Sequence, residues 1–295
     1  MFTRQKTGII GGLLIFILIS AGNVYAGVGT TAVNFLKIGL GARASAMGDA
    51  FTALADDGSC LYWNPAGLVQ LKDKQLLVSY NSWFAGIKRG YISFTLPLSE
   101  EEGVGVGTNY LDMGTLEGRD EEGNPTEPFG ASDFQLSVGY AKRFSDKFMA
   151  GLSGGILKDT IAGNEKNTYS VNAGILFFIK KSLSLGLSVQ NIGPKLSGGS
   201  LPLNFKLGVA KKTESLTLTA DISKPTDNRM YFSIGGDWSI RENLFLRVGY
   251  KSNRDIASGI TIGIGLKRKK IGLDYAYLPY GDLGNTHRVS LIMRF

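Results

Sequence analysis

The sequence predicts an all-β protein, a 14-stranded antiparallel transmembrane β-barrel with an N-terminal, partly helical plug in the lumen. The first observation behind this prediction is that apolar and polar side chains alternate from Gln75 to the C-terminus. The second is that the alternating segments are even in number and mostly about ten residues long, the length that a tilted strand needs to cross a bilayer. The third is that short turns and longer loops follow one another between the segments, as in bacterial outer-membrane barrels.

The first 26 residues have the pattern of a secretory signal peptide. Arg4 and Lys6 precede an apolar run from Ile9 to Ile19, and small residues then lead to a cleavage site after Ala26. The run is shorter than the roughly 20 residues of a transmembrane helix, so a retained anchor is the weaker alternative. Export to the bacterial outer membrane is expected, and the loss of two basic residues lowers the net charge from +7 to +5.

Residues 27–74 precede the first strand and are predicted to form the plug, or hatch. A barrel of this strand number encloses a lumen that wall side chains cannot fill, since about eight strands is the limit for that. The segment would enter from the periplasmic end, and a tail packed beneath the barrel is the alternative. Gly58 is predicted to end a helical stretch with an apolar face. That face consists of Leu40, Met47, Phe51 and Leu54.

Strands are predicted throughout residues 75–295, the transmembrane barrel domain. In one of them, Leu185 and Leu187 share a face opposite Ser184 and Ser188. The predicted spans are 75–84, 87–97, 103–111, 133–144, 147–158, 168–179, 182–191, 203–211, 215–222, 229–238, 243–251, 257–266, 269–278 and 286–295.

A soluble β-sandwich or lipocalin-like barrel would alternate in the same way. It is disfavoured because so many strands exceed what a soluble up-and-down barrel normally uses. The polar face also carries charges of both signs, which would pair across a lumen. These charged residues are Asp133, Arg143, Lys206, Asp221, Asp237, Arg247 and Asp274.

Composition excludes several classes of function. The basic excess is spread along the chain, and an exported protein rarely meets nucleic acid, so no nucleic-acid partner is expected. Cys60 is the only cysteine and His287 the only histidine, which leaves no disulfide and no metal or catalytic cluster. The adjacent carboxylates Asp56 and Asp57 lack the further ligands of a cation site. We therefore expect no enzyme activity, no metal and no cofactor.

The C-terminal segment HRVSLIMRF alternates to its last residue, Phe295. It resembles the closing strand of bacterial outer-membrane proteins, in which the terminal aromatic residue is part of the signal read by the assembly machinery. The resemblance implies that the outer-membrane assembly machinery and outer-membrane lipid are partners.

The segment GARASAMGDAFTALADDGSCLYWNPAGL, residues 41–68, resembles the opening segment of the PorV/PorQ family of outer-membrane proteins. This family belongs to a wider FadL-like group of barrels, typified by the fatty-acid transporter FadL and including TodX. The likeness covers residues 33–68, and beyond them it depends on strand number and general pattern. It implies a barrel with an internal hatch formed by the N-terminal segment.

The resemblance also implies candidate site residues. The family's Gly-Ala-Arg element falls on residues 41–43 and its Asn-Pro-Ala motif on residues 64–66. In FadL-type transporters the hatch helps to hold a hydrophobic ligand. Beside the second motif, Tyr62 and Trp63 add an apolar patch and Gly67 permits a tight turn. The candidate hatch residues are Gly41, Ala42, Arg43, Tyr62, Trp63, Asn64, Pro65, Ala66 and Gly67.

In FadL-type transporters a kink in the third strand also opens the wall sideways into the membrane. The third predicted strand here contains Gly103, Gly105 and Gly107, which could weaken the wall, although no proline or bulge marks a kink. The longest predicted loop, Asp112–Ser132, is strongly acidic, which does not favour the apolar surface groove of FadL relatives.

Two functions follow as hypotheses. The first is the passage or binding of small hydrophobic compounds through a plugged lumen, which requires only what this chain contains and is favoured for that reason. The second is a PorV-like role in a type IX secretion system, handling exported protein cargo at the cell surface. A structural membrane protein with a permanently sealed lumen is a third possibility. The expected partner is accordingly a hydrophobic small molecule or secreted protein cargo.

Overall fold

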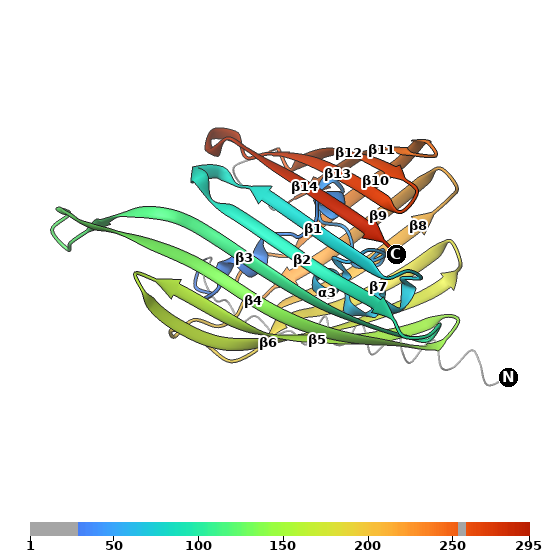
Figure 1. The fold of residues 1–295 in the computed structure, drawn as a ribbon, viewed down its shortest axis with the longest axis horizontal. Coiled ribbons are helices and arrows are strands. Elements are labelled where there is room, and N and C mark those ends of the chain that lie inside the picture. The colour runs from blue at the N-terminus through green and yellow to red at the C-terminus, as the bar shows by residue number, and fades with distance from the viewer. Residues whose placement is uncertain (1–28, 253–257) are drawn as a thin grey trace.

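The computed structural model describes residues 29–252 and 258–295, in which 14 strands close into an antiparallel barrel (Figure 1). Strands adjacent in sequence pair with each other, and β1 (Gln75–Ser82) pairs with β14 (Asn285–Arg294) to complete the wall. The predicted fold class and strand number are confirmed. The predicted signal peptide, residues 1–26, lies outside the described residues.

The remaining strands follow the predicted order, with small shifts at their ends except in β3 and β4, which are much longer than predicted. They are β2 (Lys88–Pro97), β3 (Glu102–Arg119), β4 (Pro125–Ser145), β5 (Phe148–Ile161), β6 (Asn164–Lys180), β7 (Leu183–Ile192), β8 (Asn204–Lys212), β9 (Leu216–Pro225), β10 (Tyr231–Arg241), β11 (Leu244–Lys251), β12 (Ile260–Arg268) and β13 (Ile271–Pro279).

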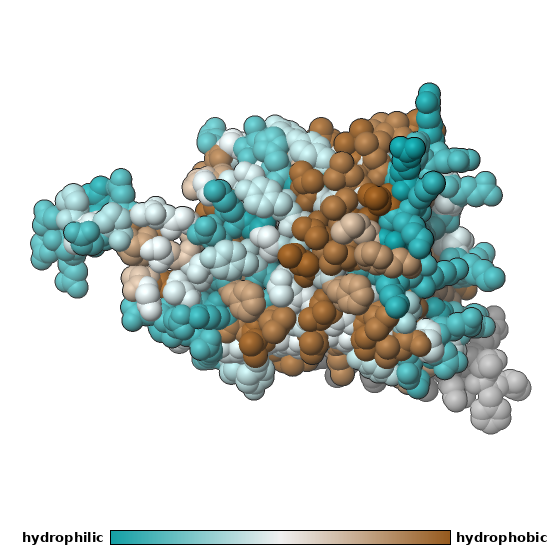
Figure 2. Space-filling view, in the orientation of Figure 1, coloured by the Kyte–Doolittle hydropathy of each residue, from teal (hydrophilic) through white to brown (hydrophobic). Residues whose placement is uncertain are grey.

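The alternation in sequence corresponds to an apolar outer face and a polar inner face. In β4, Leu136 and Val138 lie on the outer face and are 37% and 62% exposed, whereas the adjacent Gln135 lies on the inner face and is 7% exposed. Figure 2 shows hydrophobic side chains gathered over the middle of one face of the wall, with hydrophilic side chains toward both ends. An apolar band between polar rims is the surface that a bilayer requires of a barrel.

The two ends of the barrel differ in their connections. One end, which we call the turn end, carries only tight connections such as those after β4 and β6, and Phe295 donates its backbone N–H to the Lys74 carbonyl there at 3.0 Å. The opposite end, the loop end, carries the longer connections, apart from the two-residue turn between β5 and β6. Because bacterial barrels have short periplasmic turns and long outer loops, the loop end corresponds to the cell exterior.

The prediction of a long acidic loop at Asp112–Ser132 is wrong. The structure instead continues β3 and β4 past the rest of the wall as a two-stranded ribbon, residues 113–131, which projects from the loop end (Figure 1). The two strands pair with each other through register shifts after Asp112 and Leu116, so the ribbon lacks the strict alternation that marks a membrane strand.

The plug runs through the lumen in the direction opposite to the one predicted. Thr31 bridges Ser200 in the β7–β8 loop, and the Ala32 N–H donates to the Ser200 carbonyl at 3.0 Å, so the described chain begins at the loop end. It leaves at the turn end, where Arg143 donates to the Val69 carbonyl at 3.2 Å. The predicted entry from the periplasmic end is therefore wrong, because the segment crosses the whole lumen before β1 starts.

The plug contains only short helical pieces. Its α-helices are α2 (Ala42–Ala46) and α3 (Cys60–Trp63), and its 3₁₀-helices are η1 (Asn34–Lys37) and η2 (Pro65–Gln70); η3 (Phe84–Gly86) and η4 (Gly281–Leu283) lie in outer loops. Among the described residues, no helix is both long and apolar enough to span a bilayer.

The single helical stretch expected between Leu40 and Gly58 is not formed. Gly48 and Asp49 adopt φ values of 67° and 65°, which end the helical path after α2, whereas Gly58 is not in the left-handed region. The four residues expected on its apolar face are nevertheless all buried, because they pack against different parts of the wall.

Glycines on the inner face let the plug backbone approach the wall backbone. A Cβ on Gly235 would lie 2.5 Å from the Met47 carbonyl oxygen, and one on Gly151 would lie 2.6 Å from the Ala66 nitrogen. No real Cβ atom has room at such positions. The glycine content therefore reflects the close fit between the plug and the wall.

Gly235→Ala is expected to destabilise the protein, because the added methyl group overlaps the backbone of Met47 and overpacking costs about 1–3 kcal/mol. Gly236→Ala, at the next position of β10, is the matched control because its methyl group would meet nothing closer than 3.8 Å. Thermal unfolding followed by circular dichroism in detergent should give a lower Tm for G235A only. Equal Tm values for the two variants would contradict this packing.

Candidate functional site

The Asn-Pro-Ala motif fixes the plug to the wall at mid-lumen. The fully buried Asn64 side chain accepts from the Ala66 N–H at 3.1 Å and donates to the carbonyls of Thr52 and Ile175 at 2.8 and 3.0 Å. Pro65 occupies the first position of η2, where its missing N–H costs nothing. Gly67 is required next to it, since a Cβ there would lie 2.0 Å from the Ala55 carbonyl oxygen.

Tyr62 and Trp63 hold the plug together from within. The Tyr62 hydroxyl donates to the Leu36 carbonyl at 2.8 Å, and the Trp63 indole N–H donates to the Leu40 carbonyl at 2.9 Å. Lys206 of β8 places its ammonium 4.4 Å from the centre of a Trp63 ring, a cation–π contact. The structure thus places the predicted apolar patch in internal packing.

The Gly-Ala-Arg element begins α2 near the turn end. Gly41 has a φ of 80°, which favours glycine, and the Ala42 N–H donates to Ser290 of β14 at 2.8 Å. Arg43 then forms ion pairs within the plug, to Asp56 at 2.6 Å and to Asp57 at 3.7 Å. It forms a third ion pair with the wall, to Asp237 of β10 at 3.0 Å.

These contacts belong to a charge network that spans the plug and the wall. Lys212 of β8 also pairs with Asp56, and Arg247 of β11 pairs with Asp237 at 3.1 Å and Asp274 at 2.7 Å. Burial would raise the pKa of the Asp56 carboxyl, but Arg43 and Lys212 together hold that pKa well below its usual range. Asp56 therefore stays charged at neutral pH, and the ion pairs of the network tie the plug to the turn end of the wall.

The three glycines of β3 face the plug. A Cβ on Gly103 would lie 2.7 Å from the Leu68 carbonyl oxygen, and one on Gly105 would lie 2.9 Å from a Leu68 methyl group. A Cβ on Gly107 would lie 3.4 Å from a Leu61 methyl group of the plug. The ladders to β2 and β4 run through all three positions without a register shift. In this structure the glycines make room for the plug, and the wall is not broken there.

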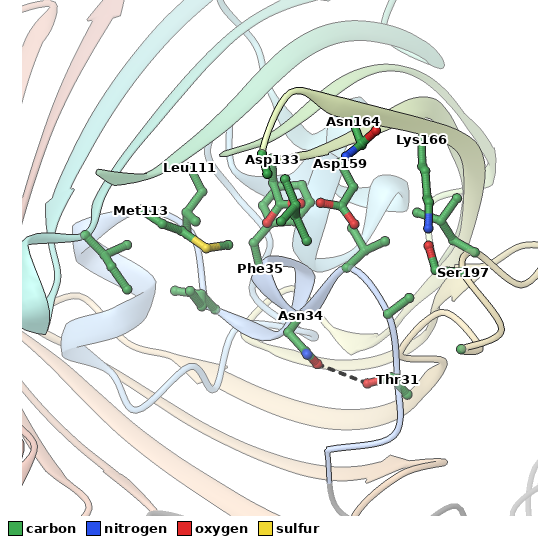
Figure 3. A pocket seen from close by; sticks show the side chains of 18 of the residues that line it. Thr31, Asn34, Phe35, Leu111, Met113, Asp133, Asp159, Asn164, Lys166 and Ser197 are labelled. Carbon is green, nitrogen blue, oxygen red and sulfur yellow. Dashed lines mark hydrogen bonds between the residues drawn. The ribbon is translucent and has the colours of Figure 1, made fainter. Parts of the chain in front are cut away.

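Above the plug, at the loop end, lies an open cavity of about 1080 Å³, which we call the outer cavity (Figure 3). Apolar side chains from the plug, the wall and the outer loops form most of its lining, and two carboxylates and a lysine are also present. The lining residues that matter here are Phe35, Ile38, Trp83, Ile87, Leu111, Met113, Asp133, Asp159, Lys166 and Leu196.

The outer cavity was not predicted from the sequence. Its lining comes from the first described residues of the plug, from β3 to β6 and from the β7–β8 loop, so no local motif connects them. Only the closure of the barrel brings these segments together. The alternation of Leu111, Asp133 and Asp159 onto the inner face was the one usable signal.

Residues 29–252 and 258–295 contain no group of three or more His, Cys, Asp or Glu side chains placed to hold a metal ion. Cys60 is buried in the plug, and His287 contacts the Tyr275 hydroxyl at 2.7 Å on the outer face. The arrangement can seal a lumen and enclose a ligand at its outer end.

Comparison with known protein families gives one match. A family model described as type IX secretion system protein PorV matches residues 22–212. This range includes the hatch motifs and the wall up to β8. No curated protein sequence matches the chain closely enough to count as a relative.

Solved structures with the same fold include several transporters. The Ralstonia pickettii toluene transporter TbuX matches at a TM-score of 0.66 with 13% identity, covering 87% of this chain and 98% of that one. The Pseudomonas putida toluene transporter TodX matches at 0.64 with 13% identity, covering 86% and 96%. A Pseudomonas aeruginosa FadL homologue matches at 0.64 with 11% identity, covering 86% and 98%. At these identities the likeness establishes the fold, and none of the matched descriptions names an enzyme.

Arg43→Gln is expected to loosen the plug at the turn end, because three carboxylates lose their shared cation. Leaving a buried charge unpaired costs up to about 3–5 kcal/mol, and the 17% exposure of the Arg43 side chain reduces this cost. Arg241→Gln, an exposed position in the same strand as Asp237, is the control. Faster proteolysis of the plug and a lower Tm are expected for R43Q only, and wild-type behaviour of R43Q would show that the network does not hold the plug.

Proposed function

The chain belongs to the PorV family, and on that premise we propose that it is an outer-membrane barrel that binds a small hydrophobic compound in the outer cavity. Binding there is the entry step for passage through the plugged lumen. The observation that carries the proposal is the cavity itself, about 1080 Å³ in volume, mostly apolar in its lining and open at the loop end. Ligand pockets of proteins are typically of about 300–1,000 Å³ with such a lining.

The remaining parts of the molecule have roles that fit this proposal. Residues 1–26 direct export and are removed, residues 27–74 act as the hatch, and residues 75–295 form the barrel in the lipid. The exposed Phe295 at the end of the last strand is available to the outer-membrane assembly machinery. The solved transporters of this fold are described as carrying toluene or monoaromatic hydrocarbons, which supports a small aromatic compound as the ligand class to test first.

Passage beyond the cavity requires movement of the plug. Below the cavity, Phe35 and Leu36 are buried, and Arg89 of β2 donates to the carbonyls of Ile38 and Gly39. Together with the Asn64 contacts and the charge network, these bonds separate the cavity from the turn end. The candidate hatch residues therefore serve as the barrier in this proposal, and the ligand contacts are made above them.

Met113→Trp should weaken binding of 2-phenylethanol, a small aromatic probe, because the indole occupies part of the outer cavity. A loss of about tenfold, or 1.4 kcal/mol, is expected. Titration calorimetry on protein in lipid nanodiscs, corrected for empty nanodiscs, measures it. Leu116→Trp is the control because Leu116, farther out on the same ribbon, does not line the cavity. No saturable binding by the wild-type protein would remove the proposal.

A second function is favoured by the family match and by the ribbon. The matching family is described as a type IX secretion system protein, which suggests a role in handling exported protein cargo at the cell surface. The ribbon projects from the loop end and carries exposed acidic side chains, which offers a contact surface to a partner. An isolated two-stranded hairpin is marginally stable in water, so a partner would also stabilise it. The acidic residues are Glu117, Asp120, Glu121, Glu122 and Glu127.

A photo-cross-linking amino acid at Glu121 should capture secretion components or exported cargo in the native cell. The same amino acid at Lys147, in the β4–β5 turn at the turn end, should not capture them. Mass spectrometry of the cross-linked products identifies the partners. Recovery of neither cargo nor secretion components from the ribbon position would argue against this second role.

A further inference from the structure

Two carboxylates lie directly opposite each other on the inner wall of the outer cavity. Asp133 of β4 and Asp159 of β5 are register partners, and Figure 3 shows their side chains among those that line the cavity. Directly opposite residues of an antiparallel pair have Cβ atoms about 4.5–5.5 Å apart, and like charges at such positions destabilise the sheet. The pair therefore lowers the stability of the barrel.

Within the chain this cost is offset only in part, because Arg89 acts on Asp133 and Lys166 acts on Asp159 without forming an ion pair. In the parts of the chain that the structure describes, no hydrogen bond or ion pair reaches the carboxylate of Asp133 or Asp159, although Asp133 is only 3% exposed. The nearby Arg89 donates to Asn109 at 2.8 Å and to plug carbonyls. Lys166, opposite Asp159 on β6, is exposed at the rim.

Other carboxylates on the inner wall of this barrel do form ion pairs. Asp221 pairs with Lys206 at 3.4 Å, and Asp274 pairs with Arg247 at 2.7 Å. A buried charge is expensive unless it is paired. Asp133 and Asp159, which face the outer cavity, differ from these acids because neither forms an ion pair with a residue that the structure describes.

The rest of the cavity decides what kind of cation fits. Two carboxylates supply too few oxygens for a Ca²⁺ ion, which takes about six to eight, and no third His, Cys, Asp or Glu among the described residues completes a cluster. The remaining wall is apolar, with Phe35, Leu111 and Met113 close to the pair. The complementary ligand has an apolar body and a single cationic head.

We propose that the outer cavity selects a primary ammonium compound with a small aromatic or aliphatic body. Its ammonium group lies between the Asp133 and Asp159 carboxylates, and its apolar body contacts Phe35, Leu111 and Met113. This inference rests on the proposed ligand-binding function of the cavity and names the ligand class. An ammonium has three donors and can bond both carboxylates at once.

The test compares three probes of similar size on protein in lipid nanodiscs: 2-phenylethylamine, 2-phenylethanol and 3-phenylpropionate. At pH 7 they are cationic, neutral and anionic, and titration calorimetry with empty nanodiscs subtracted gives their Kd values. The amine should bind at least about tenfold more tightly than the alcohol, and the carboxylate should bind most weakly.

The variants locate the cause of this preference. Asp133→Asn should remove the amine's advantage and leave the alcohol unchanged. Glu165→Gln is the matched control, since it removes the same charge at the same end of the barrel from a residue that pairs with Lys158 at 2.5 Å outside the cavity. Asp159→Asn should act like D133N, and it decides alone if D133N does not fold.

Each outcome has a defined meaning. Equal affinity for amine and alcohol, or an amine preference that survives both Asp variants, overturns this inference and leaves the hydrophobic-ligand proposal standing. Binding of none of the probes removes both. An amine preference lost equally in E165Q would show a general charge effect, and it would also overturn the proposed site.

Discussion

A polypeptide within a bilayer has to satisfy its backbone hydrogen bonds internally, and the rest of this structure follows from that constraint. A closed barrel is the β-sheet solution, because closure leaves no unpaired edge. With 14 strands, closure also creates a lumen wider than wall side chains can fill. The plug therefore completes a fold that would otherwise enclose an aqueous channel.

The plug is irregular, so its own polar groups have to be satisfied by the wall. Asp221 of β9 shows how this is done: one carboxylate oxygen accepts from the N–H groups of Phe51 and Thr52, both at 3.1 Å, and from the Thr52 hydroxyl at 2.6 Å. Inner-wall polar residues thus act toward the plug as capping residues act toward helix ends. Inner-wall glycines supply the complementary feature, since they let the two backbones meet.

The sequence was informative where one local rule decides the structure. The alternation of Leu185 with Ser184 is such a rule, since lipid on one side and the lumen on the other impose a period of two. Prediction from the sequence failed where contacts between residues far apart in the sequence determine the structure. The ribbon forms because two strands pair beyond the membrane, where alternation is not required. The path of the plug depends on the contact of Thr31 with Ser200, far apart in sequence. The structure places the Gly-Ala-Arg and Asn-Pro-Ala residues in the plug, but their hydrogen-bond partners follow only from barrel closure, and their role as a hatch stays a prediction.

The division of the lumen explains where function concentrates. From Leu40 to Gln70, the plug packs against the inner wall through side chains, glycines and ion pairs. Above Phe35 the plug narrows to a single extended segment along the β7–β8 loop, and the wall around it is left without a partner. Beside residues 40–70, polar residues of the inner wall bond to the plug, as Asp221 and Asp237 do. Asp133 and Asp159, above the plug, form no hydrogen bond or ion pair with any residue that the structure describes. Because a buried charge is costly unless it is paired, a ligand that brings a cation to them would remove a cost that the chain leaves.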